Sequence, residues 1–134
     1  MLDCLILGDS VAAGLAQARP ECVAYVADKI NSRAWLSKNL EKSPYSARTV
    51  IISLGNHDRQ DINSQHDIRT IRQLVKADRV FWIMPAPTFK HSAMQAVSLV
   101  AREFGDTVLT NIPKAADNIQ PSPQGYKKIL KETK

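Results

Sequence analysis

The chain has 134 residues, of which 44% are hydrophobic and 23% are charged, with a formal net charge of +5 at pH 7. This length suits one domain with one core, and we expect residues 1–134 to form it. No apolar run approaches the roughly 20 residues of a membrane-spanning helix, and residues 1–7 carry an acid where a signal peptide carries basic residues. We therefore expect no membrane association and a cytoplasmic location.

The positive charge is spread along the chain. Its densest group has helical spacing near the end: Lys127, Lys128, Lys131 and Lys134. This spacing favours a solvated helix face, so we do not expect nucleic acid as a partner. Cys4 and Cys22 lack a metal-type spacing, and we expect two buried thiols in a reducing compartment. Because no glycine-rich phosphate loop or zinc motif is present, we expect no cofactor and no metal.

Taken in chain order, the apolar periodicity predicts alternating strands and helices. The predicted elements are a strand at 2–7, a helix at 11–30 that is broken at Pro20 and resumes after it, a short strand at 31–36, a loop or short helix at 38–48, a strand at 49–54, a helix at 61–77, a strand at 79–84, a helix at 91–104, a short strand at 107–109, a loop at 112–120 and a last helix from Ser122-Pro123 to about 131. This alternation implies an α/β domain with a parallel sheet. Chemistry then gathers beyond the carboxyl ends of the strands, in loops 8–14, 55–60, 85–91 and 115–122.

The first of these loops presents a serine, Ser10, in the turn Gly8-Asp9-Ser10 between a strand and a helix. At a helix N-terminus a serine hydroxyl is exposed, and the nearby N–H groups can stabilise an oxyanion. Serine is also a good helix cap, and by itself the turn favours that alternative.

The second loop, Gly55-Asn56-His57-Asp58, follows the strand at 49–54 and is rich in polar side chains. Asn56 or His57 could donate a hydrogen bond to a developing negative charge. The simpler interpretation of Asp58 is a cap for the helix that follows.

The third segment runs from Asp117 to Tyr126 and contains Asp117-Asn118-Ile119-Gln120, then Pro121-Ser122, then Gly125-Tyr126. Together the three segments resemble the SGNH (GDSL) hydrolase family of esterases, lipases, acetylhydrolases and carbohydrate deacetylases. The resemblance spans nearly the whole chain, with the motifs in the family's order. It implies a three-layer α/β/α domain built on a flavodoxin-like, five-stranded parallel sheet.

The resemblance also implies roles for individual residues. Ser10 occupies the position of the nucleophile, and its backbone N–H that of one oxyanion donor. Asp117 matches the acid that orients the catalytic histidine. Gly55 and Asp58 match the ends of the family's middle block, which binds substrate.

Three positions depart from the family pattern. Gln120 stands in the histidine position, and an amide cannot take the serine proton, although it could hydrogen-bond Ser10 and Asp117. His57 aligns with the family's asparagine, unless a one-residue shift restores Asn56. No glycine lies between residues 15 and 54, so Ala34 or a neighbour would have to supply the remaining oxyanion N–H.

His57 is the histidine that could act as a substitute base. The resemblance therefore predicts a serine esterase, acting on short acyl esters or acetylated carbohydrates, with an impaired or rewired base. The alternative is a catalytically inactive protein of the same fold, used for ligand binding or as a structural component of an assembly.

Overall fold

A computed structural model describes residues 1–59, 62–87 and 92–134; residues 88–91, and with them His91 at the start of a predicted helix, lie outside the described ranges. The elements in chain order are β1 (Leu2–Gly8), α1 (Ser10–Ala18), β2 (Val23–Val26), α2 (Ser32–Asn39), the 3₁₀ helix η1 (Leu40–Lys42), β3 (Tyr45–Ser53), α3 (Ser64–Gln73), β4 (Val75–Ile83), α4 (Ser92–Phe104), β5 (Thr107–Leu109) and α5 (Pro123–Glu132). In these ranges no helix combines the length and the apolar character that crossing a membrane requires.

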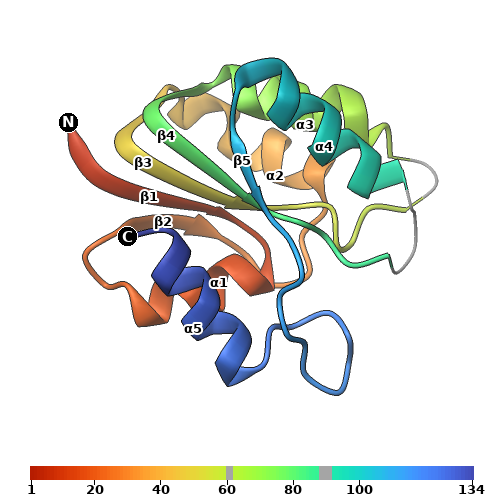
Figure 1. Cartoon of the computed structure of the whole chain (residues 1–134). Helices are drawn as coiled ribbons and strands as arrows, with labels where there is room; N and C mark the ends of the chain where they lie inside the picture. Colours follow the sequence, from red (N-terminus) through yellow and green to blue (C-terminus); the bar gives the residue numbers. More distant parts are fainter. Residues whose placement is uncertain (60–61, 88–91) are drawn as a thin grey trace.

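The five strands form one parallel sheet in the order β2-β1-β3-β4-β5 (Figure 1). Gly8 at the end of β1 is aligned with Val26 of β2 and Ser53 of β3. Because the strands all run in the same direction, their carboxyl ends lie at one edge of the sheet. This strand order is that of flavodoxin-like sheets and confirms the predicted fold class.

Helices cover both faces of the sheet, with α1 and α5 on one face and α2, α3 and α4 on the other (Figure 1). Successive strand residues alternate between the two faces. Leu5 and Leu7 of β1 therefore belong to the core beneath α2, α3 and α4, while Cys4 and Ile6 belong to the core beneath α1 and α5. Trp82 of β4 is fully buried in the first of these cores.

The segment after Pro20 differs from the prediction. Val23–Val26 forms β2, an edge strand paired with β1, where a second helical piece was expected. The predicted strand at 31–36 is instead occupied by α2, which Asn31 caps. An edge strand of four residues has too little apolar pattern to be recognised locally, and its pairing with β1 decides its conformation.

Cys4 and Cys22 form a disulfide, with Cα atoms 4.8 Å apart, so the prediction of two free thiols was wrong. The strand register explains the pairing: Leu5 is aligned with Val23, which puts the residues just before them side by side. Disulfides persist mainly in oxidising compartments. The two cysteines therefore give no support to the expected cytoplasmic location.

The central strands begin earlier than predicted. β3 starts at Tyr45 and β4 at Val75, and these two residues are aligned with each other. The helix predicted to reach residue 77 ends at Gln73 as α3. Hydrogen bonding between the two strands thus extends the sheet past the apolar runs from which the strands were predicted.

Candidate active site

Three of the predicted loops meet at the carboxyl edge of the sheet. The Asp9 N–H, after β1, donates to the Ser53 carbonyl at the end of β3 at 3.0 Å. The Ala86 N–H, after β4, donates to Asn56 Oδ1, after β3, at 2.7 Å. Hydrogen bonds therefore join the described parts of the loops that follow β1, β3 and β4.

Ser10 is the first residue of α1, and the residue before it caps the helix. The Asp9 side chain accepts a hydrogen bond from the Val11 N–H at 3.0 Å. The alternative in which Ser10 itself is the cap is therefore wrong. In the described part of the chain neither the hydroxyl nor the N–H of Ser10 is hydrogen-bonded to protein, and the side chain is half-exposed. Both groups are available to a ligand.

Gly8 allows the turn to approach β3 closely. Its φ of +143° lies in a region that favours glycine, and a Cβ built on it would stand 1.9 Å from the Ser53 carbonyl oxygen. A larger residue would push the turn away from β3 and break the Asp9–Ser53 backbone hydrogen bond. Gly8 thereby sets the position of Ser10 relative to the neighbouring loop.

The Asp9 carboxylate is the centre of a buried network. Asp9 is fully buried and accepts hydrogen bonds from Ser53 Oγ at 3.0 Å and from Asn56 Nδ2 at 2.9 Å, besides that from Val11. Burial raises the pKa of the Asp9 carboxyl above its ordinary value, and the three hydrogen bonds act against that shift. Asn56 Oδ1 also accepts a hydrogen bond from the Ala86 N–H. The network therefore connects the serine turn to the loops that follow β3 and β4.

His57 lies beside this network. Its Nε2 is buried and has no hydrogen-bond partner within the described ranges, and a positive charge on the ring would lower the pKa of the Asp9 carboxyl. The turn that carries it is closed by the Asp58 N–H, which donates to the Gly55 carbonyl at 3.2 Å. The His57 ring therefore has a nitrogen without a protein partner in the described residues, whereas the Asn56 amide is hydrogen-bonded within the network.

Asp58 does not cap α3, as had been expected, because Asn63 does. Asp58 is instead fully buried and accepts hydrogen bonds from the N–H and hydroxyl of Ser32, at 2.8 and 2.9 Å, and from the Ser64 hydroxyl at 2.6 Å. It joins the first residues of α2 and α3 and supports the loop that carries His57.

Ala34, predicted as an oxyanion donor, is not available for that role. It lies in the first turn of α2, and its N–H donates to Asn31 Oδ1 at 2.8 Å. A short strand was predicted at 31–36, and the helix that forms there instead uses the Ala34 N–H for its own cap.

The loop between β5 and α5 carries the residues of the third segment. Both the Ile119 and Gln120 N–H groups donate to Asp117 Oδ1 at 2.9 Å, and these bonds lower the pKa of the exposed Asp117 carboxyl. The Gln120 side-chain oxygen is buried without a hydrogen-bond partner in the described residues. The sequence suggested that the Gln120 side chain could hydrogen-bond Ser10 and Asp117. Neither hydrogen bond is present among the described residues. Asp117 shapes the turn through the backbone instead.

Two residues to which the prediction gave no role are subject to the charges of the site. Lys114 is half-buried, and its ammonium interacts with the charges of Asp9 and Asp117. The Tyr126 hydroxyl donates to the Val11 carbonyl at 3.2 Å and is subject to the same two carboxylates. Lys114 stands in a loop without periodicity and belongs to no motif, so no local signal pointed to it.

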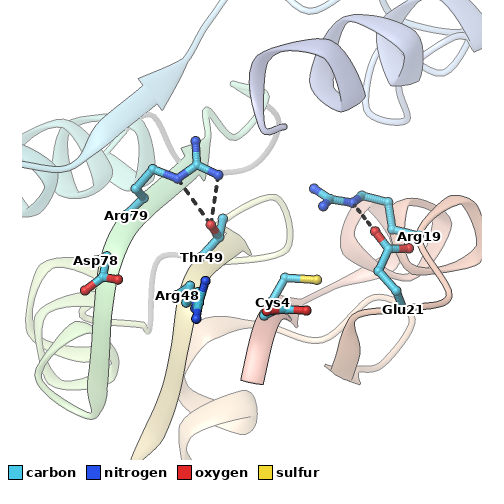
Figure 2. A pocket seen from close by; sticks show the side chains of 8 residues that line it. Cys4, Arg19, Glu21, Arg48, Thr49, Asp78 and Arg79 are labelled. Carbon is cyan, nitrogen blue, oxygen red and sulfur yellow. Dashed lines mark hydrogen bonds and ion pairs between the residues drawn. The ribbon is translucent and has the colours of Figure 1, made fainter. Parts of the chain in front are cut away.

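A separate hollow of about 530 Å³ lies beside the amino end of β1 and the middle of β3 and β4 (Figure 2). It is lined by Asp3, Cys4, Arg19, Glu21, Arg48, Thr49, Asp78 and Arg79. Arg19 donates to Glu21 at 3.0 Å and Arg79 donates to Thr49 Oγ1 at 2.9 Å. Three arginines face three carboxylates, so the lining has no net charge that would select an anion.

Several solved structures share this architecture. A GDSL-like lipase from Bacteroides thetaiotaomicron matches with a TM-score of 0.66 at 15% identity, over 98% of this chain and 85% of its own. A putative acylhydrolase from Bacteroides fragilis gives 0.65 at 14% identity, over 98% and 84%. The C-terminal catalytic domain of peptidoglycan O-acetyltransferase A from Streptococcus pneumoniae gives 0.60 at 15%, over 98% and 91%.

The likeness lies in the fold, because these identities are low. No family sequence model matches the chain, and no curated protein sequence does. The chain has the α/β/α fold of the SGNH (GDSL) hydrolases, with Ser10 at the turn after β1 and Asp117 in the loop before α5.

Proposed function

We propose that this protein is a serine ester hydrolase of the SGNH type, acting on short acyl esters such as acetyl groups on carbohydrates. The proposal depends on one observation, which is that the hydroxyl and N–H of Ser10 are left available for a ligand. Asp9 performs the capping that would otherwise occupy a serine here, which leaves the Ser10 hydroxyl and N–H without protein partners in the described residues. A serine retained only as a cap would be engaged by the helix.

The proposed reaction begins with attack of Ser10 Oγ on the acyl carbonyl. The negative charge that develops on the carbonyl oxygen accepts hydrogen bonds from the Ser10 N–H and from a donor in the Gly55–His57 turn. The ester's alcohol leaves, and water hydrolyses the acyl-serine. Asp117 shapes the loop that faces the turn, and Gln120 occupies the histidine position without accepting a proton.

Gln120 argues against rapid hydrolysis, because its amide cannot accept the Ser10 proton. Removal of one member of a catalytic triad leaves roughly 10³–10⁴-fold catalysis over water. An enzyme with Gln120 is therefore expected to be slow unless another group accepts the Ser10 proton. His57 remains a prediction for that role, because its Nε2 lacks a protein partner in the described residues.

The second candidate function is a catalytically inactive protein that binds a ligand at the same edge. The Gln120 side-chain oxygen favours it, since it is buried without a hydrogen-bond partner among the described residues. An amide there can bind a ligand but cannot relay a proton. Fold alone does not separate the two functions.

Hydrolysis of p-nitrophenyl acetate tests the two candidates. We expect Ser10→Ala to lower kcat/KM to the non-enzymatic background, while Ser37→Ala on the exposed face of α2 leaves it unchanged. Gln120→His should raise kcat/KM about 100-fold or more, the usual contribution of a general base.

Each outcome decides between the candidates. Equal turnover by the unmodified protein and Ser10→Ala, together with an inactive Gln120→His, contradicts the hydrolase and supports the binding function. Activity that appears only in Gln120→His identifies a site with every group in place except the base.

A further inference from the structure

The disulfide end of the hollow brings together three side chains that can ligate a metal ion. The sulfur atoms of Cys4 and Cys22 and a carboxylate oxygen of Glu21 all lie within 4.8 Å of one another. Among the described residues, no other three histidine, cysteine or acidic side chains hold their ligand atoms this close. The spacing of the two cysteines along the chain indicated no metal motif, because the register of β1 and β2 brings them together.

The hollow makes these three side chains accessible from solvent. Cys4 and Glu21 both line it, and Figure 2 shows the Cys4 sulfur on the side that carries Glu21. The two cysteines are nearly buried, at 3% and 8% exposure, whereas the Glu21 side chain is 56% exposed. The cavity of about 530 Å³ therefore lets a small reductant or an ion approach, and it leaves room for a water molecule as a further ligand.

The Glu21 carboxylate is held in place by a chain of hydrogen bonds. Arg19 Nε donates to Glu21 Oε2 at 3.0 Å, and Arg19 Nη1 donates to the carbonyl and hydroxyl of Thr133 at 3.2 and 3.3 Å. Thr133 is fully buried at the end of α5. Hydrogen bonds of this kind orient the ligands of metal sites. The Glu21 N–H and Arg19 also lower the pKa of the Glu21 carboxyl, so it is charged at neutral pH.

The redox state of the two cysteines decides the charge of this cluster. In the disulfide, the two sulfurs are bonded to each other and neither is a thiolate. The hollow itself is then balanced, since three arginines face three carboxylates. Reduction and loss of the thiol protons add two negative charges beside Glu21. Two thiolates and a carboxylate suit a divalent ion, and thiolate sulfur selects Zn²⁺ over the hard cations Mg²⁺ and Ca²⁺.

We propose that reduction of the Cys4–Cys22 disulfide creates a zinc site, with Cys4, Cys22 and Glu21 as protein ligands and water as the fourth ligand. A dithiol reductant gives two electrons and two protons to the disulfide and becomes a disulfide itself. Zn²⁺ then displaces the two thiol protons, forming two Zn–S bonds of about 2.3 Å and a Zn–O bond of about 2.0–2.2 Å. Tetrahedral geometry places the sulfurs about 3.7 Å apart. Cα atoms 4.8 Å apart allow this spacing by side-chain rotation.

The ion would replace the disulfide as the cross-link between β1 and the residue that precedes β2. β2 is an edge strand of four residues, so the cross-link keeps it paired with β1 in either redox state. The site lies at the amino end of β1, whereas Ser10 follows the carboxyl end of that strand. The zinc site is therefore independent of the proposed hydrolase function.

Cobalt, a spectroscopic probe for zinc, tests the site in the whole chain. The protein is reduced with a phosphine, which becomes the phosphine oxide, and Co²⁺ is then titrated in without oxygen. We expect a thiolate-to-cobalt charge-transfer band that saturates at one ion per chain and disappears when Zn²⁺ is added. The oxidised protein should show no such band, because it contains no thiolate.

Variants identify the ligands. Glu21→Gln keeps the disulfide but removes the carboxylate, and competition with a chromophoric chelator should show zinc affinity lowered about 10-fold or more. The matched control is Glu41→Gln on the exposed surface of η1, which should bind like the unmodified protein. Cys4→Ser should abolish the charge-transfer band of a two-thiolate site. Ser10→Ala should bind zinc normally, which separates this test from that of the hydrolase.

Two results would overturn the zinc site. One is the absence of a thiolate-to-cobalt band in the reduced protein, and the other is equal zinc affinity in Glu21→Gln and the unmodified protein. If reduction unfolds the chain, circular dichroism replaces the cobalt titration. Zinc should then restore the spectrum of the reduced protein but not that of Cys4→Ser, and failure to restore it also overturns the proposal.

Discussion

The two sides of the candidate site are built in different ways. On the nucleophile side, Asp9 and Asn56 are almost fully buried and connect three loops through side-chain hydrogen bonds. On the opposite side, the 113–122 loop is held by backbone hydrogen bonds and by the exposed Asp117, and within the described ranges the Gln120 side chain makes no hydrogen bond that orients it.

This difference shows which side chains of the site the fold allows to be replaced. A buried carboxylate with three donors cannot be replaced without leaving those donors unsatisfied. A side chain on a loop that is shaped through its backbone can be exchanged without disturbing the loop. The nucleophile side therefore keeps its geometry whatever residue stands at position 120.

The largest expected effect is on the nucleophile side. Asp9→Ala leaves the Val11 N–H, the Ser53 hydroxyl and the Asn56 amide without their acceptor. At about 1–3 kcal/mol for each unsatisfied group, and with incomplete additivity, the free energy of unfolding should fall by about 4 kcal/mol in urea denaturation.

The exposed Asp28→Ala is the control and should change stability little. If Asp9→Ala does not accumulate as folded protein, Asp9→Asn can be measured, since it keeps the shape but sets an amide against the Asn56 amide. A loss below about 1 kcal/mol in both variants contradicts a central role for this network.

The disulfide belongs to neither side of the candidate site, so its removal gives a reference value for loss of stability. The disulfide joins residues 18 apart, and replacing both Cys4 and Cys22 by serine should lower the free energy of unfolding by about 3 kcal/mol. Dithiothreitol should destabilise the unmodified protein to the same degree. Two thiols that titrate freely in the native protein would show that the bond does not form.

In the 113–122 loop we expect a substitution that raises the free energy of unfolding. Gln120→Met replaces a buried oxygen that has no partner in the described residues, so the free energy of unfolding should rise by about 1 kcal/mol. The neighbouring Gln124→Met, which is exposed, should not produce this gain. A loss of stability in Gln120→Met would mean that the amide is satisfied in solution, and the contrast between the two sides would weaken.

The smallest effect is a local one, at Asp117. Because hydrogen bonds from the Ile119 and Gln120 N–H groups lower the Asp117 pKa, the charged side chain supports the turn at pH above the ordinary aspartate value of about 4. This support is lost as pH falls through the lowered pKa. Asp117→Ala should speed amide hydrogen exchange at Ile119 and Gln120 at neutral pH, with almost no change in global stability. Unchanged exchange contradicts this role.

The order of elements and much of the site could be predicted from the sequence. The apolar runs at 2–7, 49–54 and 79–84 predicted the three central strands, because residues buried on both faces of a parallel sheet leave a continuous pattern. The turn Gly8-Asp9-Ser10 was recognisable because turn and helix-start residues act locally. Ser122, the N-cap of α5, was predicted for the same reason.

Other features were decided by tertiary contacts. The choice of β2 over a helix depends on pairing with β1, and the Cys4–Cys22 disulfide follows from the same register. That Asp9, and not Ser10, caps α1 depends on a network that reaches Ser53 and Asn56, more than 40 residues along the chain.

The sequence by itself thus determined an α/β chain with a serine at the sheet edge, and its resemblance to the SGNH hydrolases predicted that Gln120 stands where that family has its histidine. Only the tertiary structure decided which residues surround that serine, because Asp9 before it is hydrogen-bonded to Ser53 and Asn56 at the end of another strand. Local patterns record which backbone conformation a segment adopts. They do not record which distant side chains share its surroundings, and the chemistry of Ser10 depends on those surroundings.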